Sequence, residues 1–159
     1  MLLRKARPED AERVGEVDVR SFLKSGWGEA HSMAQDEELQ RERRTEARQY
    51  CREHPDWVYV AVEDGDIVGF ATIEYDEEQR SGRIQNNAVL EEYRNRGIST
   101  QLVERAVAEL GKLGARHISV HTTHVPAARR VYEKAGFELV HHEGESYTYE
   151  MNLAEQHSH

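Results

Sequence analysis

The dipeptide Asp64-Gly65 is the feature that most constrains the fold of this chain, because it separates two runs rich in β-branched and aromatic residues, 57–63 and 67–75. Asp-Gly favours the positive φ angles that a two-residue hairpin turn requires, so the two runs are predicted to be antiparallel neighbours. A further strand-like run, 83–90, follows after a polar turn. The middle of the chain is therefore predicted to be an antiparallel meander.

Helices and further strands flank this meander. Pro8, followed by two acidic residues, is typical of a first helical turn. Gly97 precedes an amphipathic helix that ends near Gly114, and Gly136 is suited to cap a helix that begins at Pro126. The predicted order is a strand at 2–7, a helix from 8 to about 22, a loop at 25–32, a highly charged helix at 35–53, the meander, the helix after 97, a strand at 117–121, the helix after 126, and strands at 137–142 and 147–153.

This order predicts one mixed α/β domain of the α+β class over residues 1–153, with a mostly antiparallel sheet of about seven strands flanked by four helices. Residues 154–159 are predicted to be a frayed tail. A chain of 159 residues fits one domain and can bury a core without disulfides. Cys51, the only cysteine, is therefore interpreted as a packing residue.

The charge balance argues against several classes of partner. Asp and Glu number 30 against 21 Lys and Arg, a net charge of -9, which disfavours nucleic acid binding because such binding depends on clustered basic residues. An acidic surface suits a cationic substrate better. No stretch is long and apolar enough to span a bilayer, and the early charges of Arg4 and Lys5 are unlike a signal peptide. We therefore expect a cytoplasmic protein with no membrane and no nucleic acid partner.

The segment 89–100 is typical of an anion-binding turn. A strand ends, the chain passes through Arg94 and Arg96, and a helix begins at Gly97. The first backbone N–H groups of a helix are unpaired and lie at the positive end of its dipole, so a phosphate group is predicted there. Gly97 lets the backbone approach such a ligand closely. The alternative is an ordinary strand-to-helix turn capped by Ser99.

Two motifs resemble those of the GNAT superfamily of N-acetyltransferases. Arg94-x-x-Gly97-x-Ser99 is similar to the family's Arg/Gln-x-x-Gly-x-Gly/Ala motif, and Val-Tyr-Glu-Lys-Ala-Gly-Phe at 131–137 resembles its second signature. The order of elements from residue 2 to residue 153 also matches. The sequence contains neither a P-loop nor a Gly-x-Gly-x-x-Gly fingerprint, which disfavours nucleotide hydrolysis and hydride transfer.

The resemblance implies a GNAT-like fold, in which two central strands splay apart into a cleft, and an N-acetyltransferase with acetyl-CoA as co-substrate. It implies direct attack by a primary amine, of a small molecule or of a peptide or protein, in a ternary complex. Tyr132 would be the general acid that protonates the departing CoA thiolate, and its alternative role is that of a core aromatic. The residues that the resemblance assigns to the cofactor are Asn87, Ala88 and Val89 for the pantetheine arm, and Asn95, Arg96, Gly97, Ile98, Ser99 and Thr100 for the pyrophosphate, with Arg94 adding charge beside them.

Two positions depart from the family pattern. Ser99 replaces the second small Gly or Ala, where its hydroxyl either donates to a phosphate oxygen or crowds it. Val125 stands where the family often has an Asn that contacts the CoA arm. That hydrogen bond is therefore either absent or supplied by His124.

The sequence offers two candidates for the general base. A primary amine near pKa 10 is mostly protonated at neutral pH and must lose a proton before it attacks. Gln85 and Asn87 do not titrate usefully, which leaves Glu74 on the preceding strand or His121 on the next one. For each of these two, the alternative is a solvated or structural role. His117 and His121 would lie roughly 13 Å apart on a strand, too far to chelate one ion, so no metal site is predicted.

A noncatalytic acyl-CoA-binding sensor or interaction module of the same fold is the competing hypothesis, which Val125 favours and Tyr132 disfavours. The acceptor is left open among a small polyamine, an aminoglycoside, an amino acid, and a protein N-terminus or lysine. Trp27 and Trp57 are interpreted as packing residues rather than as walls of an acceptor pocket. Homodimerisation through edge strands is a further hypothesis for an open, mixed sheet.

Overall fold

The computed structural model describes residues 1–153; the tail at 154–159 and the side chain of Trp27 lie outside the described residues. One seven-stranded sheet has the order β1-β2-β3-β4-β5-β7-β6. Neighbouring strands are antiparallel except β4 and β5, which are parallel, so the predicted mixed, mostly antiparallel sheet is confirmed. The strands are β1 Leu2–Lys5, β2 Val58–Glu63, β3 Asp66–Asp76, β4 Ser81–Val89, β5 His117–Thr123, β6 Glu138–Glu143 and β7 Ser146–Asn152.

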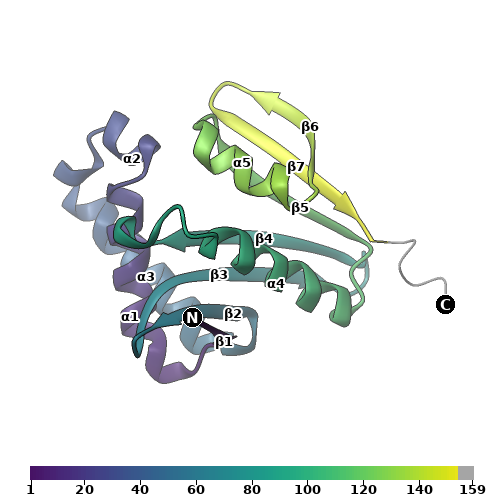
Figure 1. Ribbon diagram of the computed structural model, residues 1–159, viewed down its shortest axis with the longest axis horizontal. Helices are drawn as coiled ribbons and strands as arrows, with labels where there is room; N and C mark the ends of the chain where they lie inside the picture. The colour runs from purple at the N-terminus through teal and green to yellow at the C-terminus, as the bar shows by residue number, and fades with distance from the viewer. Residues whose placement is uncertain (154–159) are drawn as a thin grey trace.

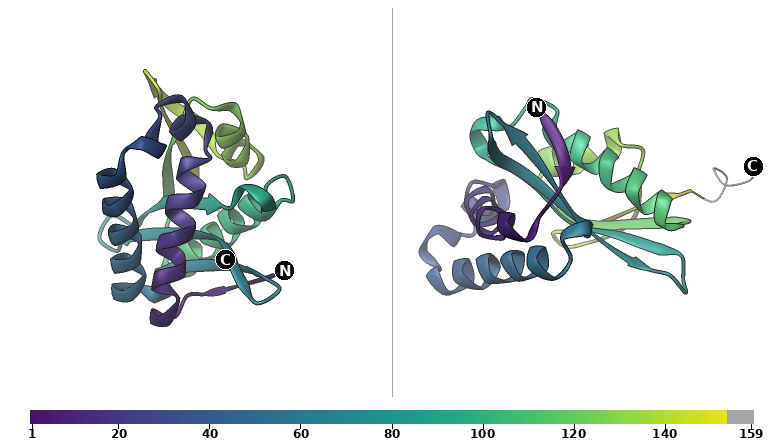
Figure 2. Two further views of the ribbon diagram at one scale, coloured as in Figure 1. Left: turned by 90° about the vertical axis from the view of Figure 1, so that its left-hand side faces the viewer. Right: turned by 90° about the horizontal axis from the view of Figure 1, so that it is seen from below.

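Helices cover both faces of this sheet (Figures 1 and 2). Two long helices, α1 and α3, pack side by side on one face, and α4 and α5 lie on the other. The described residues form five α-helices, one more than predicted, and these are α1 Ala11–Leu23, α2 Gly26–Ala30, α3 Glu37–Glu53, α4 Ile98–Leu113 and α5 Pro126–Lys134.

The additional helix is α2, which lies inside the segment predicted to be a loop, 25–32. Ser25 begins it, because its Oγ accepts a hydrogen bond from the backbone N–H of Gly28 at 2.9 Å. A Cβ on Gly28 would lie 2.1 Å from the carbonyl oxygen of Phe22, so a glycine is required there. Two glycines among five residues lower the intrinsic helix propensity, which is why the sequence pattern indicated a loop.

The turn residues have the conformations that their types predict. Asp64 and Gly65 have φ angles of 50° and 82°, and Glu63 pairs with Asp66 across this turn, which confirms the hairpin. Gly114 has a φ of 110° at the end of α4, where a glycine avoids the strain of the left-handed conformation.

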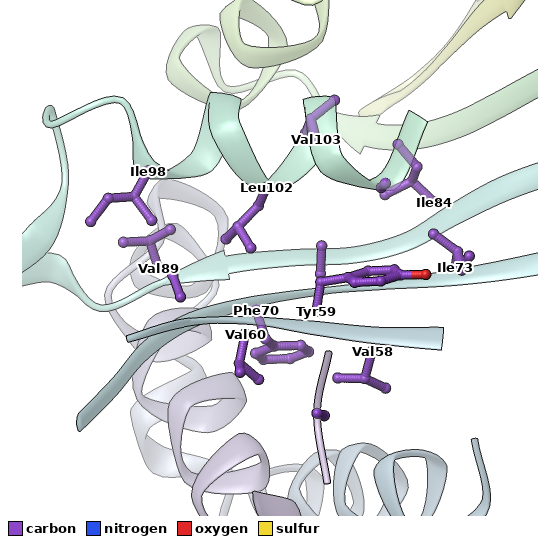
Figure 3. Close-up of a cluster of buried hydrophobic side chains, with 14 of the residues drawn as sticks. Val58, Tyr59, Val60, Phe70, Ile73, Ile84, Val89, Ile98, Leu102 and Val103 are labelled. Carbon is purple, nitrogen blue, oxygen red and sulfur yellow. The ribbon is translucent and has the colours of Figure 1, made fainter. Parts of the chain in front are cut away.

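Apolar side chains fill both interfaces between sheet and helices. Figure 3 shows Ile98 and Leu102 of α4 on one side of the sheet, and Phe70 and Val60 on the other side. Cys51 of α3 is fully buried, which confirms its role as a packing residue. Because the sheet is covered on both faces, the polar side chains of β4 and β5 are the exception to its apolar interior.

Candidate active site

The two parallel strands β4 and β5 separate halfway along their length. They pair only where Ser81–Ile84 lies beside His117–Val120. Beyond that point β4 stays paired with β3 as far as Val89, and β5 stays paired with β7 as far as Thr123. In Figure 1, β4 and β5 run apart toward the end near α2. The facing edges of their last residues are therefore open to hydrogen bonding with an extended ligand.

A cavity of about 370 Å³ opens where the strands diverge, and we call it the divergence pocket. Its walls come from both strands, from the end of α1 and the start of α2, from the turn into α4, and from α5. Among its lining residues are Asn87 and Val89 of β4, Thr122 and Thr123 of β5, Phe22, Asn95, Ser99, Val125 and Val131. It is the cleft between the central strands that the resemblance implied.

The N-terminus of α4 lies at the edge of the divergence pocket with no side-chain cap from the described residues. The N-cap position is occupied by Gly97 rather than by Ser99, so Ser99 is not the capping residue. Gly97 has a φ of 80°, and a Cβ there would meet only the Gln101 amide, at 4.0 Å. Asn95 also has a positive φ, of 64°. The first backbone N–H groups of a helix have no intrahelical partner, and the space beside Gly97 is open, which suits an anion.

Arg94 and Arg96 differ in what they do beside this turn. The Arg94 guanidinium donates to three carbonyl oxygens, those of Ser21 at 3.0 Å, Lys24 at 2.7 Å and Val89 at 3.3 Å. It therefore joins the end of α1 to the end of β4. Arg96 is exposed and lies over the Tyr93 ring at 5.0 Å, so its charge remains accessible beside the helix N-terminus.

Tyr132 of α5 is buried, with 7% of its surface exposed. Its ring packs against Phe137 and Tyr149, with centroids 6.0 Å and 6.3 Å away. Burial raises the pKa of Tyr132 to about 12, and a hydrogen bond with the Asn87 side chain partly opposes this rise. Tyr132 is thus a core aromatic whose hydroxyl meets β4 beyond the point of divergence. The Asn87 amide also donates to the Ser99 carbonyl at 3.4 Å, which links the ends of β4, α4 and α5.

Val125 contacts the α2 region instead of offering a polar group. A Cβ on Gly26 would lie 3.1 Å from both of its γ-methyl groups. His124 is exposed and is not among the residues that line the divergence pocket. The other residues predicted to bind the cofactor, Ala88, Ile98 and Thr100, lie on β4 and in the first turn of α4.

A second cavity, of about 320 Å³, lies on the opposite face of the sheet beneath α1 and α3, and we call it the α1/α3 pocket. Gln85, Asn86 and His121 line it, whereas Asn87 and Thr122, the next residues along the same strands, line the divergence pocket. The two cavities therefore meet the sheet at neighbouring positions of β4 and β5. The walls of the α1/α3 pocket include Asp18, Arg43, Glu46, Tyr50, Thr72 and Arg83.

The two candidates for the base are in different surroundings. The Glu74 carboxylate accepts hydrogen bonds from Arg83, at 2.9 Å, and from Gln85, and it does not line the α1/α3 pocket. His121 lines that pocket, and its Nδ1 lies 2.9 Å from Thr148 Oγ1. The structure thus brings His121 to the cavity and leaves Glu74 in an ion pair.

Sequence reasoning missed Asp18, which is only 5% exposed in the wall of the α1/α3 pocket. Burial raises its pKa, and the Arg43 guanidinium, whose Nη2 lies 3.1 Å from Asp18 Oδ1, opposes the rise. A signal was present, because Asp18 lies between Val17 and Val19 on the apolar side of a helix. A carboxylate is almost never buried unless it is paired, as Asp18 is with Arg43.

Among the described residues, no group of His, Cys, Asp and Glu side chains is arranged to hold a metal ion. Of the helices formed by residues 1–153, none combines the length and apolarity needed to cross a membrane.

Comparison with known proteins identifies the family. A sequence model of the GNAT acetyltransferase family matches residues 5–137. The structure resembles the PaiA N-acetyltransferase from Thermoplasma acidophilum in complex with coenzyme A, with 18% identity and a TM-score of 0.81 over 96% of this chain and 98% of that chain. It also resembles Ard1 from Thermoplasma volcanium, with 20% identity and a TM-score of 0.69 over 96% and 97% of the two chains.

A third similar structure is the ribosomal-protein-alanine N-acetyltransferase from Brucella melitensis, with 17% identity and a TM-score of 0.71 over 96% of this chain and 100% of that chain. No curated protein matches the sequence. Identities this low establish a common fold, and the match to the family model extends over most of the chain. The chain therefore belongs to the GNAT family of acetyltransferases.

Proposed function

We propose that the protein is an N-acetyltransferase that moves the acetyl group of acetyl-CoA to a primary amine by direct attack in a ternary complex. The observation that supports this most is the divergence of β4 and β5, with one cavity on each face of the sheet at that point. Two substrates can approach one another there from opposite sides. The family match and a similar fold in an N-acetyltransferase bound to coenzyme A support the same conclusion.

The residues around the divergence pocket fit the cofactor. The uncapped first turn of α4, with Gly97 facing open space, offers backbone N–H groups to the pyrophosphate, and Arg96 adds an accessible charge. Asn87, Ala88 and Val89 offer the open edge of β4 to the pantetheine arm. Acetyl-CoA supplies an acetyl thioester, whose acyl carbon accepts the amine. Arg94 is a positioning residue in this account, because its guanidinium is occupied by main-chain carbonyls.

Tyr132 has the properties of the general acid. Its hydroxyl holds a proton at neutral pH and donates it to a sulfur that gains negative charge. The pKa raised to about 12 makes it a weaker acid than a free tyrosine, so the donation requires contact with the departing thiolate. When the C–N bond forms and the C–S bond breaks, the thiolate takes the proton of Tyr132. Packing against Phe137 and Tyr149 keeps the ring in place for this transfer.

His121 is the better candidate for the base that accepts the amine proton. With Nδ1–H donating to Thr148 Oγ1, the other ring nitrogen, Nε2, keeps its lone pair for a proton, and the side chain lines the α1/α3 pocket. The Glu74 carboxylate is engaged by Arg83 and Gln85 and does not line the α1/α3 pocket, so it does not face an amine bound there.

The test is release of free CoA thiol from acetyl-CoA in the presence of simple primary amines. Tyr132→Phe should lower kcat by about a hundredfold or more, the range for loss of a general acid, with little change in acetyl-CoA affinity. Tyr75→Phe is the matched control, because the Tyr75 hydroxyl lies beside Gly114 at the other end of α4. Equal turnover in the wild type and Tyr132→Phe would refute the acid role. Binding of acetyl-CoA without thiol release from any amine would favour the noncatalytic acyl-CoA-binding module instead.

A further inference from the structure

The α1/α3 pocket has a charge pattern that bears on the acceptor, and the inference drawn from it rests on the proposed function. Its two wall carboxylates are Asp18 of α1 and Glu46 of α3. They lie close enough for the charge of Glu46 to raise the pKa of Asp18. Two carboxylates that repel one another beside a cavity are stabilised when a cation joins them.

The two guanidinium groups of the pocket already have carboxylate partners. Arg43 binds Asp18 at 3.1 Å and lies over the Phe22 ring at 3.9 Å. Arg83 binds Glu74 at 2.9 Å. Arg83 is thus offset by Glu74, and the wall carboxylates Asp18 and Glu46 together carry one more charge than Arg43 neutralises. The cavity therefore favours a cationic ligand over an anionic one.

The floor of the pocket is neutral and polar. Asn86 donates to Thr72 Oγ1 at 3.2 Å, and Thr72 donates to Gln85 Oε1 at 3.4 Å. These groups offer hydrogen bonds to an amine but no charge that would repel it. His121, the candidate base, lines the same floor where β5 leaves β4. A molecule in the pocket can thus reach both His121 and the carboxylates of α1 and α3.

We infer that the acceptor is a small diamine, whose reacting amine lies at His121 and whose second, protonated amine is held by Glu46 and Asp18. In the covalent step the C–N bond forms at the first amine only, and His121 takes the proton which that amine loses. The second amine stays protonated throughout, since its ammonium is what the carboxylates recognise.

A matched set of acceptors tests this inference by thiol release from acetyl-CoA. Diaminobutane, butylamine and γ-aminobutyrate share one chain length and differ only in the charge at the far end. The expected kcat/KM for diaminobutane exceeds that for butylamine by about tenfold or more, with γ-aminobutyrate the poorest of the three. Arg43 Nε is buried without a partner among the described residues, so a ligand carboxylate is the alternative that γ-aminobutyrate probes.

Substitutions test whether Glu46 binds the second amine of the acceptor. Glu46→Gln should lower kcat/KM for diaminobutane by about tenfold, mainly through KM, and leave butylamine unchanged. Glu46 is exposed, so this change should not disturb folding, as Asp18→Asn could by freeing Arg43. Glu78→Gln, in the exposed turn between β3 and β4, removes the same charge from the surface. It should leave kcat/KM unchanged for both diaminobutane and butylamine.

The outcomes separate this inference from the function it rests on. The diamine inference would be overturned if kcat/KM for butylamine or γ-aminobutyrate equalled that for diaminobutane. It would also be overturned if Glu46→Gln left the KM for diaminobutane unchanged. Neither result would contradict N-acetylation. No thiol release with any of the three amines would overturn the diamine, and N-acetylation itself would fall if no other primary amine, small or peptidic, released thiol.

Discussion

At the scale of single residues, the chemistry depends on protonation states that the surroundings fix. Burial keeps Tyr132 protonated, because an ionised phenol would lose its hydration in the packed interior. The cause also sets the sign of the pH dependence. A raised pKa means that the acid form persists into alkaline solution, so ionisation of Tyr132 should not reduce the rate until the pH approaches about 12.

Removal of the proposed base gives a prediction at this scale. His121→Gln should lower the rate at neutral pH by about a hundredfold, the range for a general base, whereas Glu74→Gln should change it little. The difference in rate between His121→Gln and the wild type should become smaller as the pH rises toward 10, because the amine then loses its proton to solvent. Rate profiles from pH 6 to 10 measure both effects. A larger loss in Glu74→Gln than in His121→Gln would reverse the assignment.

At the scale of elements, Arg94 connects parts of the chain that are far apart in sequence. Its three hydrogen bonds attach the last turn of α1 to the end of β4, directly before the anion-binding turn. The Arg20–Glu92 ion pair, at 3.4 Å, joins the same two segments. Because α1 also carries Asp18, the same helix contacts both the turn before α4 and the α1/α3 pocket.

Arg94→Lys distinguishes this support from a purely electrostatic role. A lysine keeps the charge but cannot reach three carbonyls with one ammonium group. We expect a loss of about 2 kcal/mol in unfolding free energy and about tenfold weaker acetyl-CoA binding. Arg96→Lys is the control and should retain both, because Arg96 acts through its charge. Thermal unfolding and calorimetric titration give the two quantities. Wild-type stability and affinity in Arg94→Lys would show that charge alone matters.

At the scale of the whole molecule, the elements that depend on short sequence patterns were predicted from the sequence. The hairpin at Asp64-Gly65 and the helix after Gly97 depend on turn chemistry and periodicity within a few residues, and both were confirmed. Helix α5 was likewise predicted from Pro126 and the Gly136 cap and is confirmed, whereas the role of Tyr132 followed only from the resemblance to the family. Helix α2 was missed because the contact that requires Gly28, with the Phe22 carbonyl, is visible only in three dimensions.

The acceptor side of the site could not be predicted for a similar reason. The α1/α3 pocket forms where the charged helix α3 packs against α1 and the sheet. From the sequence, Glu46 and Arg43 are two among many charges on a polar helix, and nothing local distinguishes them from solvated residues. Their partners, Asp18 and His121, are distant in the chain. Only the tertiary packing of the helices assembles this set.

The central claim is that the divergence of β4 and β5, with the turn at Gly97, is an acetyl-CoA site. Calorimetric titration of acetyl-CoA into the wild type, Gly97→Asp and Gly65→Asp tests it most directly. Gly65 is a matched control, because its φ of 82° is close to the 80° of Gly97 and its turn lies in the β2–β3 hairpin. We predict saturable binding to the wild type and to Gly65→Asp, with binding to Gly97→Asp weakened by about a hundredfold or more, about 2.7 kcal/mol. No binding to the wild type, or equal binding to Gly97→Asp, would contradict the account.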